Sequence, residues 1–320
     1  MTYLITGSTG LIGAALVKAI APRGDAVVAM ARNVEKAQRM FGSMPGVEVV
    51  EWDVTRPLDA TMLPPASLKD PSSCCLVHAA AETASRGFVE KPVETIGTII
   101  DGTRNVLEFA RSLPLGKVVF LSTMEVYGSP KTDPVTETDF GFLDPAVVRS
   151  SYPEAKRLAE NLCVAYAEEY GVNVTIARLT QTFGLGVVRG DTRVFAQFAE
   201  AVLGKRDIVL HTEGRTARCY CYIDDAVSAI LTLAEKGASG EAYNVANPAT
   251  YCTIREMAEM LVAAHPPSRV VIDFSGAAGK GYAPEFKMRL STAKLEALGW
   301  RPYIGLLESY ERLIDSWREG

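Results

Sequence analysis

A glycine-rich turn near the start of the chain constrains the fold more than any other feature of the sequence. The segment Thr6-Gly7-Ser8-Thr9-Gly10-Leu11-Ile12-Gly13 follows a short apolar strand and opens a helical pattern that continues to Ile20. Glycines permit a tight turn and close backbone approach, and the first turn of a helix offers free N–H groups to a phosphate. The spacing G-x-x-G-x-x-G differs from the usual G-x-G-x-x-G, but its position between a strand and a helix predicts a dinucleotide-binding turn.

Short apolar segments alternate with helical patterns through the first half of the chain. The predicted strands are Tyr3–Thr6, Ala26–Met30, Val47–Trp52, Cys74–His78, Lys117–Ser122 and Asn173–Arg178, and the predicted helices are Leu11–Ile20, Val34–Phe41, Val93–Ser112 and Pro153–Tyr170. This alternation predicts an α/β fold with a doubly wound parallel sheet of the Rossmann type. Ser150 and Ser151 are expected to cap the last of these helices, and Gly171 is expected to end it.

The pattern changes beyond about Gly184. Helices are predicted at Val194–Leu203, Asp225–Lys236, Ile254–His265 and Leu306–Trp317, with a strand at Glu241–Ala246. We expect a dinucleotide-binding domain over residues 1–180, to which residues 217–248 return. Residues 181–216 and 249–320 are expected to form a smaller, interleaved C-terminal α/β substrate lobe.

The end of the second predicted strand bears on the choice of cofactor. An NAD site usually has Asp or Glu there to bind the ribose 2′-OH, whereas this chain has Arg32 and no acid. An arginine can pair with a 2′-phosphate, so NADP is favoured over NAD, with Lys36 as a possible helper. The alternative is that Arg32 is only a solvated residue at a strand end. Asp53, after the third strand, either reaches the adenine or caps the following turn.

Tyr152 and Lys156 lie four residues apart at the start of a predicted helix and therefore share one face. The pKa of a free tyrosine is near 10, and a neighbouring ammonium lowers it by favouring the phenolate. Ser122 and Thr123 end the fifth predicted strand, and active sites of open α/β sheets lie at the carboxyl ends of strands. The sequence thus predicts that Tyr152, assisted by Lys156, exchanges a proton with a substrate oxygen, to which a hydroxyl at the end of the fifth strand, Ser122 or Thr123, hydrogen-bonds.

Together these motifs resemble the extended short-chain dehydrogenase/reductase family, and more narrowly its nucleotide-sugar epimerase/dehydratase branch. The resemblance spans nearly the whole chain and rests on the glycine turn, His78-Ala79-Ala80, Ser122-Thr123-Met124-Glu125-Val126-Tyr127-Gly128, Tyr152-x-x-x-Lys156, and Arg218 ahead of Tyr222-Ile223-Asp224-Asp225. It implies that Tyr152 removes the proton of the sugar C4 hydroxyl while a hydride passes to the nicotinamide. It also implies that Thr123 polarises the same oxygen and that Lys156 holds the nicotinamide ribose.

The resemblance further implies which residues bind the two ligands. Those for the cofactor are Gly7, Thr9, Gly10, Leu11, Ile12, Gly13, Arg32, Asp53, Val54, His78, Ala79, Ala80, Ser122, Tyr152 and Lys156. Those for the nucleotide sugar are Glu82, Gln181, Arg193, Arg218 and Arg289, of which Arg218 and Arg289 would hold the diphosphate. The helices Val93–Ser112 and Pro153–Tyr170 resemble the four-helix bundle through which the family forms homodimers.

Some residues depart from the family pattern. Met124 stands where dehydratases have the Asp of S-T-D-E and decarboxylases have the second Ser of S-T-S-E, which argues against a complete 4,6-dehydratase. Glu125 remains, and either abstracts a C5 proton or only hydrogen-bonds a neighbour. Ile99 and Gln181 replace two usual asparagines, which suggests an altered sugar pocket.

A 4-epimerase working through transient C4 oxidation fits this set of residues best. The alternatives are a net NADPH-dependent reductase of a 4-keto nucleotide sugar or similar carbonyl, and a non-catalytic dinucleotide-sensing protein.

Composition narrows the choice of partners. The net charge of −5 argues against nucleic-acid binding, and no run reaches the roughly 18 apolar residues of a membrane span. Six cysteines and three histidines show no metal-ligand spacing, which predicts free thiols and no metal site. We therefore expect a soluble cytoplasmic enzyme.

Overall fold

A seven-stranded parallel sheet is the largest element of the computed structural model, which describes residues 1–65, 69–81, 86–277 and 285–319. Its strands are β1 (Thr2–Thr6), β2 (Ala26–Ala31), β3 (Val47–Glu51), β4 (Cys74–His78), β5 (Lys117–Thr123), β6 (Val174–Leu179) and β10 (Ala242–Val245). They lie in the order β10-β6-β5-β4-β1-β2-β3, and every neighbouring pair is parallel. The predicted doubly wound α/β class is confirmed.

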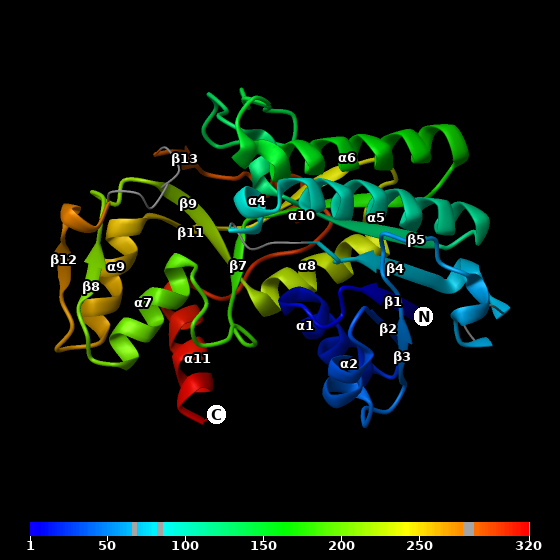
Figure 1. Ribbon diagram of the computed structural model, residues 1–320, viewed down its shortest axis with the longest axis horizontal. Helices are drawn as coiled ribbons and strands as arrows, with labels where there is room; N and C mark the ends of the chain where they lie inside the picture. Colours follow the sequence, from blue (N-terminus) through cyan, green and yellow to red (C-terminus); the bar gives the residue numbers. More distant parts are fainter. Residues whose placement is uncertain (66–68, 82–85, 278–284, 320) are drawn as a thin grey trace.

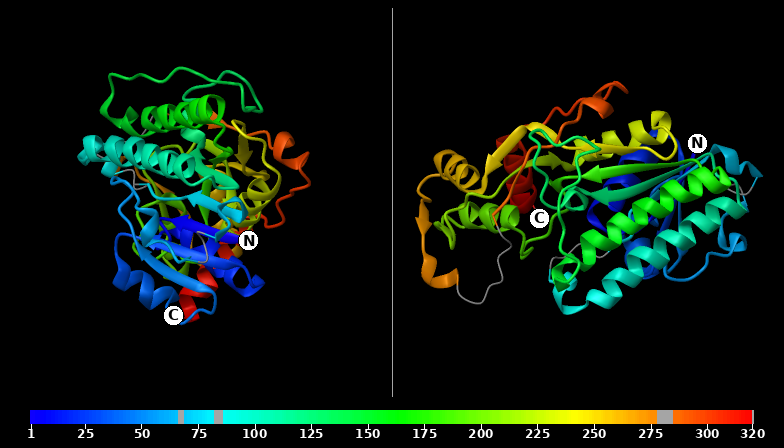
Figure 2. Two further views of the ribbon diagram at one scale, coloured as in Figure 1. Left: turned by 90° about the vertical axis from the view of Figure 1, so that its right-hand side faces the viewer. Right: turned by 90° about the horizontal axis from the view of Figure 1, so that it is seen from above.

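Helices cover both faces of this sheet (Figures 1 and 2). On one face lie α1 (Leu11–Ile20), α2 (Val34–Phe41) and α8 (Ile223–Lys236), and on the other lie α5 (Pro92–Ser112) and α6 (Ser151–Tyr170), side by side. Along β5, Val119 and Leu121 pack toward the first face, while Val118 and Phe120 pack toward the second. Burial on both faces is why central strands such as β4 and β5 are buried along their whole length rather than at alternate positions.

The sequence prediction for α6 is confirmed at the C-terminal end of the helix and is wrong at the N-terminal end. Gly171 ends the helix in the left-handed conformation, with φ of 69°, as predicted. The expected serine cap is wrong, because Ser150 makes no side-chain cap and the Ser151 hydroxyl donates to the Phe88 carbonyl at 2.9 Å. A 3₁₀ turn over Val148–Ser150 precedes the helix, so Ser150 lacks the extended backbone that a capping residue needs.

A second group of elements lies beyond one end of the large sheet (left in Figure 1). A small sheet contains β7 (Gln181–Phe183), β9 (Ala217–Tyr222), β11 (Asn247–Thr253) and β13 (Lys287–Met288), and a separate pair contains β8 (Ile208–Leu210) and β12 (Val270–Ile272). The helices α7 (Val194–Leu203), α9 (Ile254–Ala264) and α11 (Leu306–Glu319) share one apolar cluster with them, which includes Phe183, Phe195 and Tyr310. Two short helices, α4 (Gly87–Glu90) and α10 (Ala293–Glu296), complete the regular elements discussed below.

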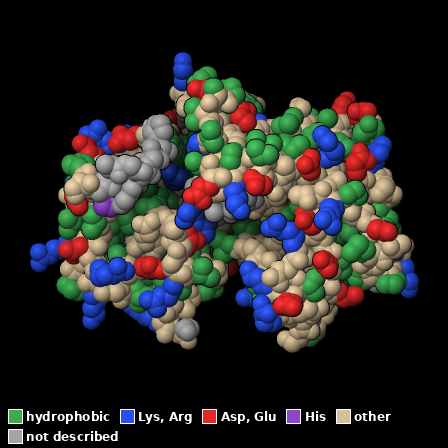
Figure 3. Space-filling model, in the orientation of Figure 1, with side chains coloured by type: hydrophobic (Ala, Val, Ile, Leu, Met, Phe, Trp, Pro, Cys, Tyr) green, Lys and Arg blue, Asp and Glu red, His purple; other side chains and the backbone are tan. Residues whose placement is uncertain are grey.

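The second group faces the carboxyl ends of the parallel strands (Figure 1). In the same orientation, Figure 3 shows a hollow between this group and the part of the molecule that carries α1 and α2. The chain crosses between the two parts more than once: β9 pairs in the small sheet, whereas α8 and β10 lie with the large one. Among the described helices, none combines the length and apolar composition needed to cross a bilayer.

Candidate active site

The glycine turn between β1 and α1 packs against the end of β4 too closely for side chains. Gly7 has φ of 63°, and a Cβ there would lie 2.8 Å from the Ala79 carbonyl carbon and oxygen. A Cβ on Gly13 would lie 2.3 Å from the Gly7 carbonyl oxygen. No side chain caps α1 at Gly10, so the first N–H groups of the helix are left for another acceptor. A turn of this shape fits a pyrophosphate group.

His78 and Thr6 fix the strand ends beside this turn. The Thr6 hydroxyl oxygen lies 2.9 Å from Nδ1 of His78 and accepts a hydrogen bond from the Ala80 N–H at 3.2 Å. Complete burial, assisted by the charge of Lys156, lowers the pKa of His78 to about 3. His78 is therefore neutral at physiological pH, and its contacts position the Ala79–Ala80 segment that lies against Gly7.

The residues predicted to select the cofactor lie on the outer side of the turn. Arg32 is exposed directly after β2, and the Lys36 ammonium donates to the Thr9 carbonyl at 3.1 Å. The Asp53 carboxylate accepts from the backbone and the hydroxyl of Thr55, so it makes the local turn contacts expected of a cap. Although burial works in the opposite direction, these hydrogen bonds and the nearby Arg32 hold the pKa of Asp53 below its usual value. The neighbouring Val54 is buried, and its carbonyl accepts from the Asn105 amide at 2.8 Å.

Tyr152 is buried beside Thr123 at the carboxyl end of β5. Its ring stacks on Phe88 with centroids 4.1 Å apart and planes 7° from parallel. Burial and, after it, the Glu125 carboxylate raise the pKa of Tyr152 well above its usual value, while the Thr123 hydrogen bond works in the opposite direction. The expected lowering of the Tyr152 pKa is not found, and in the protein alone the residue is a neutral phenol.

Lys156 explains this difference. Its ammonium donates to the Leu121 carbonyl of β5 at 2.7 Å and lies 4.6 Å from the centre of the Phe120 ring. Burial lowers the pKa of Lys156 to about 8, while Glu160 and, after it, Cys163 oppose that change. Lys156 thus lies on the expected face of α6, one turn from Tyr152, but is bonded to the backbone of β5.

Two residues that the sequence reasoning missed complete the surroundings of Tyr152. The Arg149 guanidinium donates to the Glu125 carboxylate at 2.9 and 3.2 Å and lies 4.7 Å from the centre of the Phe88 ring. Phe88 thus links Arg149 to Tyr152. The spacing of Arg149, three residues before Tyr152, is a signal that could have identified it, whereas no pattern in the sequence marks Phe88.

Met124 turns away from this group. It is buried in a cluster that includes Cys219 and Leu290, and its sulfur accepts from the Thr180 hydroxyl at 3.3 Å. Ser122 also points elsewhere, because its hydroxyl donates to Glu160 beneath the site.

The residues predicted to bind the substrate do not form one group in the structure. Arg218 on β9 pairs in register with Met288, the last residue of β13, and Arg289 directly follows that strand. The Arg218 guanidinium covers the Phe286 ring, and its buried Nε has no hydrogen-bond partner among the described residues. Arg289 lies 4.4 Å from the centre of the Tyr251 ring and 3.8 Å from the Asp133 carboxylate.

The remaining candidates are less closely grouped. Gln181 begins β7 and pairs with Tyr220, whereas the Arg193 guanidinium is bound by the Asp191 carboxylate at 2.5 to 3.1 Å. Glu82 lies outside the described residues. Within the described part of the chain, no three His, Cys, Asp or Glu side chains lie close enough to hold a metal ion.

A doubly wound sheet with a glycine turn after its first strand, and with Thr123, Tyr152 and Lys156 near the carboxyl end of β5, is typical of dinucleotide-dependent enzymes. More narrowly, the chain belongs to the NAD dependent epimerase/dehydratase family, whose model matches residues 3–246. It is therefore an enzyme of this family, as the sequence motifs predicted.

Individual relatives carry two activities in their names. The chain is 31% identical to UDP-glucuronic acid decarboxylase 3 of Arabidopsis thaliana, covering 99% of this chain and 89% of that protein. It is 30% identical to UDP-glucuronic acid decarboxylase 1 of the same plant, covering 99% and 70%. Among solved structures, the UDP-glucose 4-epimerase of Thermotoga maritima with UDP-glucose matches with a TM-score of 0.82 and 25% identity, covering 100% and 99%. The NAD complex of the Thermus thermophilus UDP-glucose 4-epimerase matches with a TM-score of 0.80 and 25% identity, covering 99% of both chains.

Proposed function

We propose that this protein is a nucleotide-sugar 4-epimerase that oxidises the sugar at C4 and returns the hydride to the opposite face. The observation that carries the proposal is the contact of Tyr152 with Thr123 at the end of β5, with Lys156 one turn further along α6. A nicotinamide, when bound, would supply the hydride acceptor and donor. The whole-length similarity to UDP-glucose 4-epimerases supports this choice.

The chain's own residues account for the proton. In the reduction direction, the neutral Tyr152 phenol donates its proton to the C4 oxygen, and Thr123 hydrogen-bonds the same oxygen. The oxidation direction requires the Tyr152 phenolate. The positive charge of Arg149 already favours that form, although burial outweighs it in the protein alone.

A second candidate is oxidative decarboxylation of a nucleotide-linked uronic acid. It is favoured by the relatives named UDP-glucuronic acid decarboxylase and by the Glu125–Arg149 pair beside Tyr152. A C4 ketone is β to the C6 carboxylate, so the electrons of the C5–C6 bond can pass to the enolate as CO₂ leaves. A proton then returns to C5, and the C4 ketone is reduced. In this candidate, Arg149 exchanges Glu125 for the substrate carboxylate.

One experiment separates these functions. The purified protein is incubated in deuterated water with UDP-glucose, UDP-galactose or UDP-glucuronic acid and either NAD or NADP, or with a 4-keto nucleotide sugar and NADPH, and each reaction is followed by proton NMR. Inversion at C4 with no net change in reduced cofactor supports the epimerase. Loss of the C6 carboxylate with deuterium at C5 supports the decarboxylase. Stoichiometric oxidation of NADPH by a 4-keto sugar would replace both with the net reductase, and no turnover of any substrate would reject all three.

We also propose that the cofactor is NADP(H) rather than NAD(H). The support is the exposed Arg32 after β2, with Lys36 bonded to the glycine turn and no acid at the strand end. Replacing Arg32 with Ala is expected to weaken NADP binding about tenfold and to leave NAD binding unchanged, as measured by calorimetry. Arg39→Ala, an exposed arginine on α2, is the control. Tighter binding of NAD than NADP by the unaltered protein would overturn the assignment.

Two further proposals concern the rest of the molecule. The small sheet would form the substrate lobe, with Arg218 and Arg289 holding the diphosphate; the unpartnered Nε of Arg218 and the adjacency of the two arginines support this. The protein would also form a homodimer through α5 and α6. Support for the dimer comes from apolar side chains exposed along both helices.

A further inference from the structure

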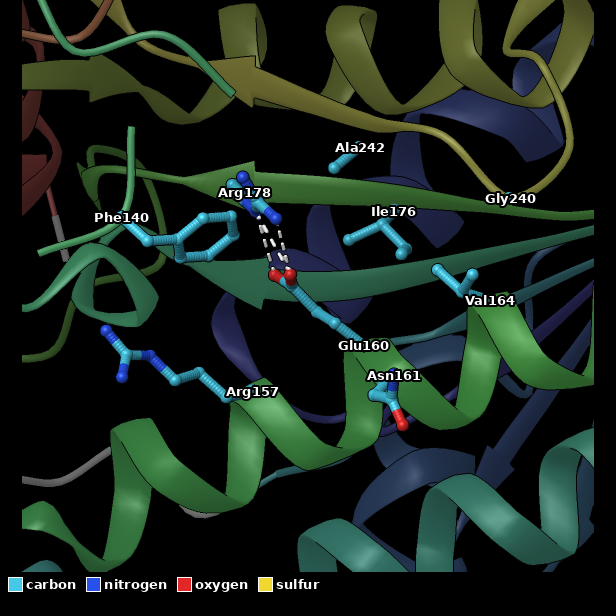
Figure 4. A pocket seen from close by; sticks show the side chains of 9 residues that line it. All are labelled: Phe140, Arg157, Glu160, Asn161, Val164, Ile176, Arg178, Gly240 and Ala242. Atoms are coloured by element: carbon cyan, nitrogen blue, oxygen red, sulfur yellow. Dashed lines mark hydrogen bonds and ion pairs between the residues drawn. The ribbon is translucent and has the colours of Figure 1, made fainter. Parts of the chain in front are cut away.

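A buried ion pair lies directly beneath Lys156. The Arg178 guanidinium on β6 binds the Glu160 carboxylate on α6 through three contacts of 2.7 to 3.1 Å. Only 6% of the Arg178 side chain and 8% of the Glu160 side chain are exposed. Figure 4 shows the two groups in direct contact, with Phe140 beside the guanidinium, and both line a pocket of about 380 Å³.

The remaining contacts of this pair hold it in one position. Arg178 also donates to the Tyr127 hydroxyl at 3.0 Å and to the Glu137 carbonyl at 2.7 Å. The Ser122 hydroxyl donates to the Glu160 carboxylate at 2.5 Å. Arg178 and Glu160 therefore both have hydrogen-bond partners besides each other. The Glu160 carboxylate is held between α6, β5 and β6.

Lys156 and Glu160 are also coupled to each other. They lie four residues apart on α6, which places them on one face of the helix. Their side chains reach consecutive residues of β5, because Lys156 donates to the Leu121 carbonyl and Glu160 accepts from the Ser122 hydroxyl. The other ionisable groups that act on Lys156 or sense its charge are Cys163 on the same helix and His78 on β4, which is neutral. Of these groups, Glu160 is the carboxylic acid, and it is paired with the Arg178 guanidinium.

We propose that Glu160 is a positioning residue, whose carboxylate, held by Arg178 and Ser122, keeps the Lys156 ammonium charged and directed at the end of β5. The inference rests on the proposed function only in that Lys156 serves the reaction. Without Glu160, the site would contain two buried cations, Lys156 and Arg178, and no carboxylate between them. Burial would then favour the neutral amine of Lys156.

The direct test is a pH titration of Lys156 in the Glu160→Gln variant. The titration is monitored by NMR of protein labelled with ¹³C at the lysine ε-carbons. The Lys156 signal is assigned as the one that disappears in Lys156→Met. We expect its titration midpoint to fall by at least about one pH unit in Glu160→Gln. The alkaline limb of kcat should move by the same amount, which makes turnover at pH 8 roughly fivefold lower while neutral-pH turnover changes less.

Three further variants protect the test from a folding artefact. Breaking one partner of a buried ion pair is destabilising, so Glu160→Met/Arg178→Met, which removes both charges, should fold more stably and still show the lower midpoint. Glu160→Asp, which keeps a carboxylate, should bring the Lys156 midpoint part of the way back to its value in the unaltered protein. Asn161→Ala, which alters the same pocket without touching the ion pair, should titrate as the unaltered protein does.

An unchanged Lys156 midpoint in both Glu160→Gln and the double variant would overturn the inference, whatever their turnover. By contrast, full turnover in Lys156→Met would refute the role of Lys156 in the proposed function and leave the titration result standing.

Discussion

At the scale of single residues, Tyr152 carries the proposed chemistry. Replacing it with Phe removes the hydroxyl but keeps the ring that stacks on Phe88. We expect kcat to fall by about a hundredfold to ten-thousandfold, because the proton donor is lost, while cofactor affinity changes little. Steady-state kinetics and calorimetric cofactor binding provide the two measurements. A Tyr152→Phe protein with unaltered turnover would remove the mechanism.

Gly13 is the residue through which the cofactor turn can be tested. A Cβ on Gly13 would lie 2.3 Å from the Gly7 carbonyl oxygen, so Gly13→Ala must open the turn. We expect the dissociation constant for the dinucleotide to rise at least about tenfold, since the pyrophosphate cradle loses its shape. Gly305→Ala is a matched control, because a Cβ there meets no atom within 4 Å. Equal losses in both variants would show that the effect is not specific to the turn.

Site residues that are close together in the sequence could be predicted from it. Residues that are distant in the sequence and come together only in the folded protein could not. Tyr152 and Lys156 could be paired because helical periodicity places residues four apart on one face. Phe88 comes from a short helix far away in sequence, so no local pattern connects it to Tyr152. The Tyr152 pKa was mispredicted for a related reason. The Tyr152 pKa depends on how deeply the residue is buried and on which oxygen the Lys156 ammonium hydrogen-bonds. Both are determined by tertiary packing.

At the scale of elements, α9 offers a test of stability separate from function. Thr253 and Glu256 form a reciprocal capping box, with bonds of 3.0 Å from the Glu256 N–H and 2.7 Å from the Thr253 N–H. Thr253→Ala should lower the free energy of unfolding by about 1 kcal/mol, as measured by urea denaturation, and leave kcat unchanged. Thr253→Ser retains the hydroxyl and should lose much less. A similar loss in both variants would mean that the methyl group, not the cap, stabilises this region.

The elements of the first half were predicted nearly to the residue, whereas the strands of the small sheet and of the separate β8–β12 pair were not. Strands such as β4 are apolar throughout because helices cover both faces, so composition alone marks them. By contrast, β7, β8 and β12 have three residues each, too few for a period of two to be recognised. The serines before α6 show the same limit, because the residue type was suitable for a cap but the preceding 3₁₀ turn fixed the wrong backbone conformation.

At the scale of the whole molecule, α5 and α6 lie on the outside of the sheet and expose apolar side chains (Figure 2). Val93 is 77% exposed and Ile96 is 43% exposed on α5, while Leu158 is 50% exposed on α6. Val93 and Ile96 are three residues apart, so they lie on one stripe of α5. Two parallel helices with such stripes can pair with the same two helices of a second copy, giving a four-helix bundle around a twofold axis.

Charges placed on these helices should therefore dissociate the proposed dimer. Leu158→Glu, alone or with Val93→Glu, is expected to convert the protein from dimer to monomer in light scattering coupled to size-exclusion chromatography, because like carboxylates would face each other across the bundle. Val209→Glu is the matched control, since Val209 is 44% exposed on β8 and far from α5 and α6 in Figure 1. If the unaltered protein is a monomer at micromolar concentration, the dimer proposal fails. A dimer that survives both substitutions would instead place the interface elsewhere on the surface.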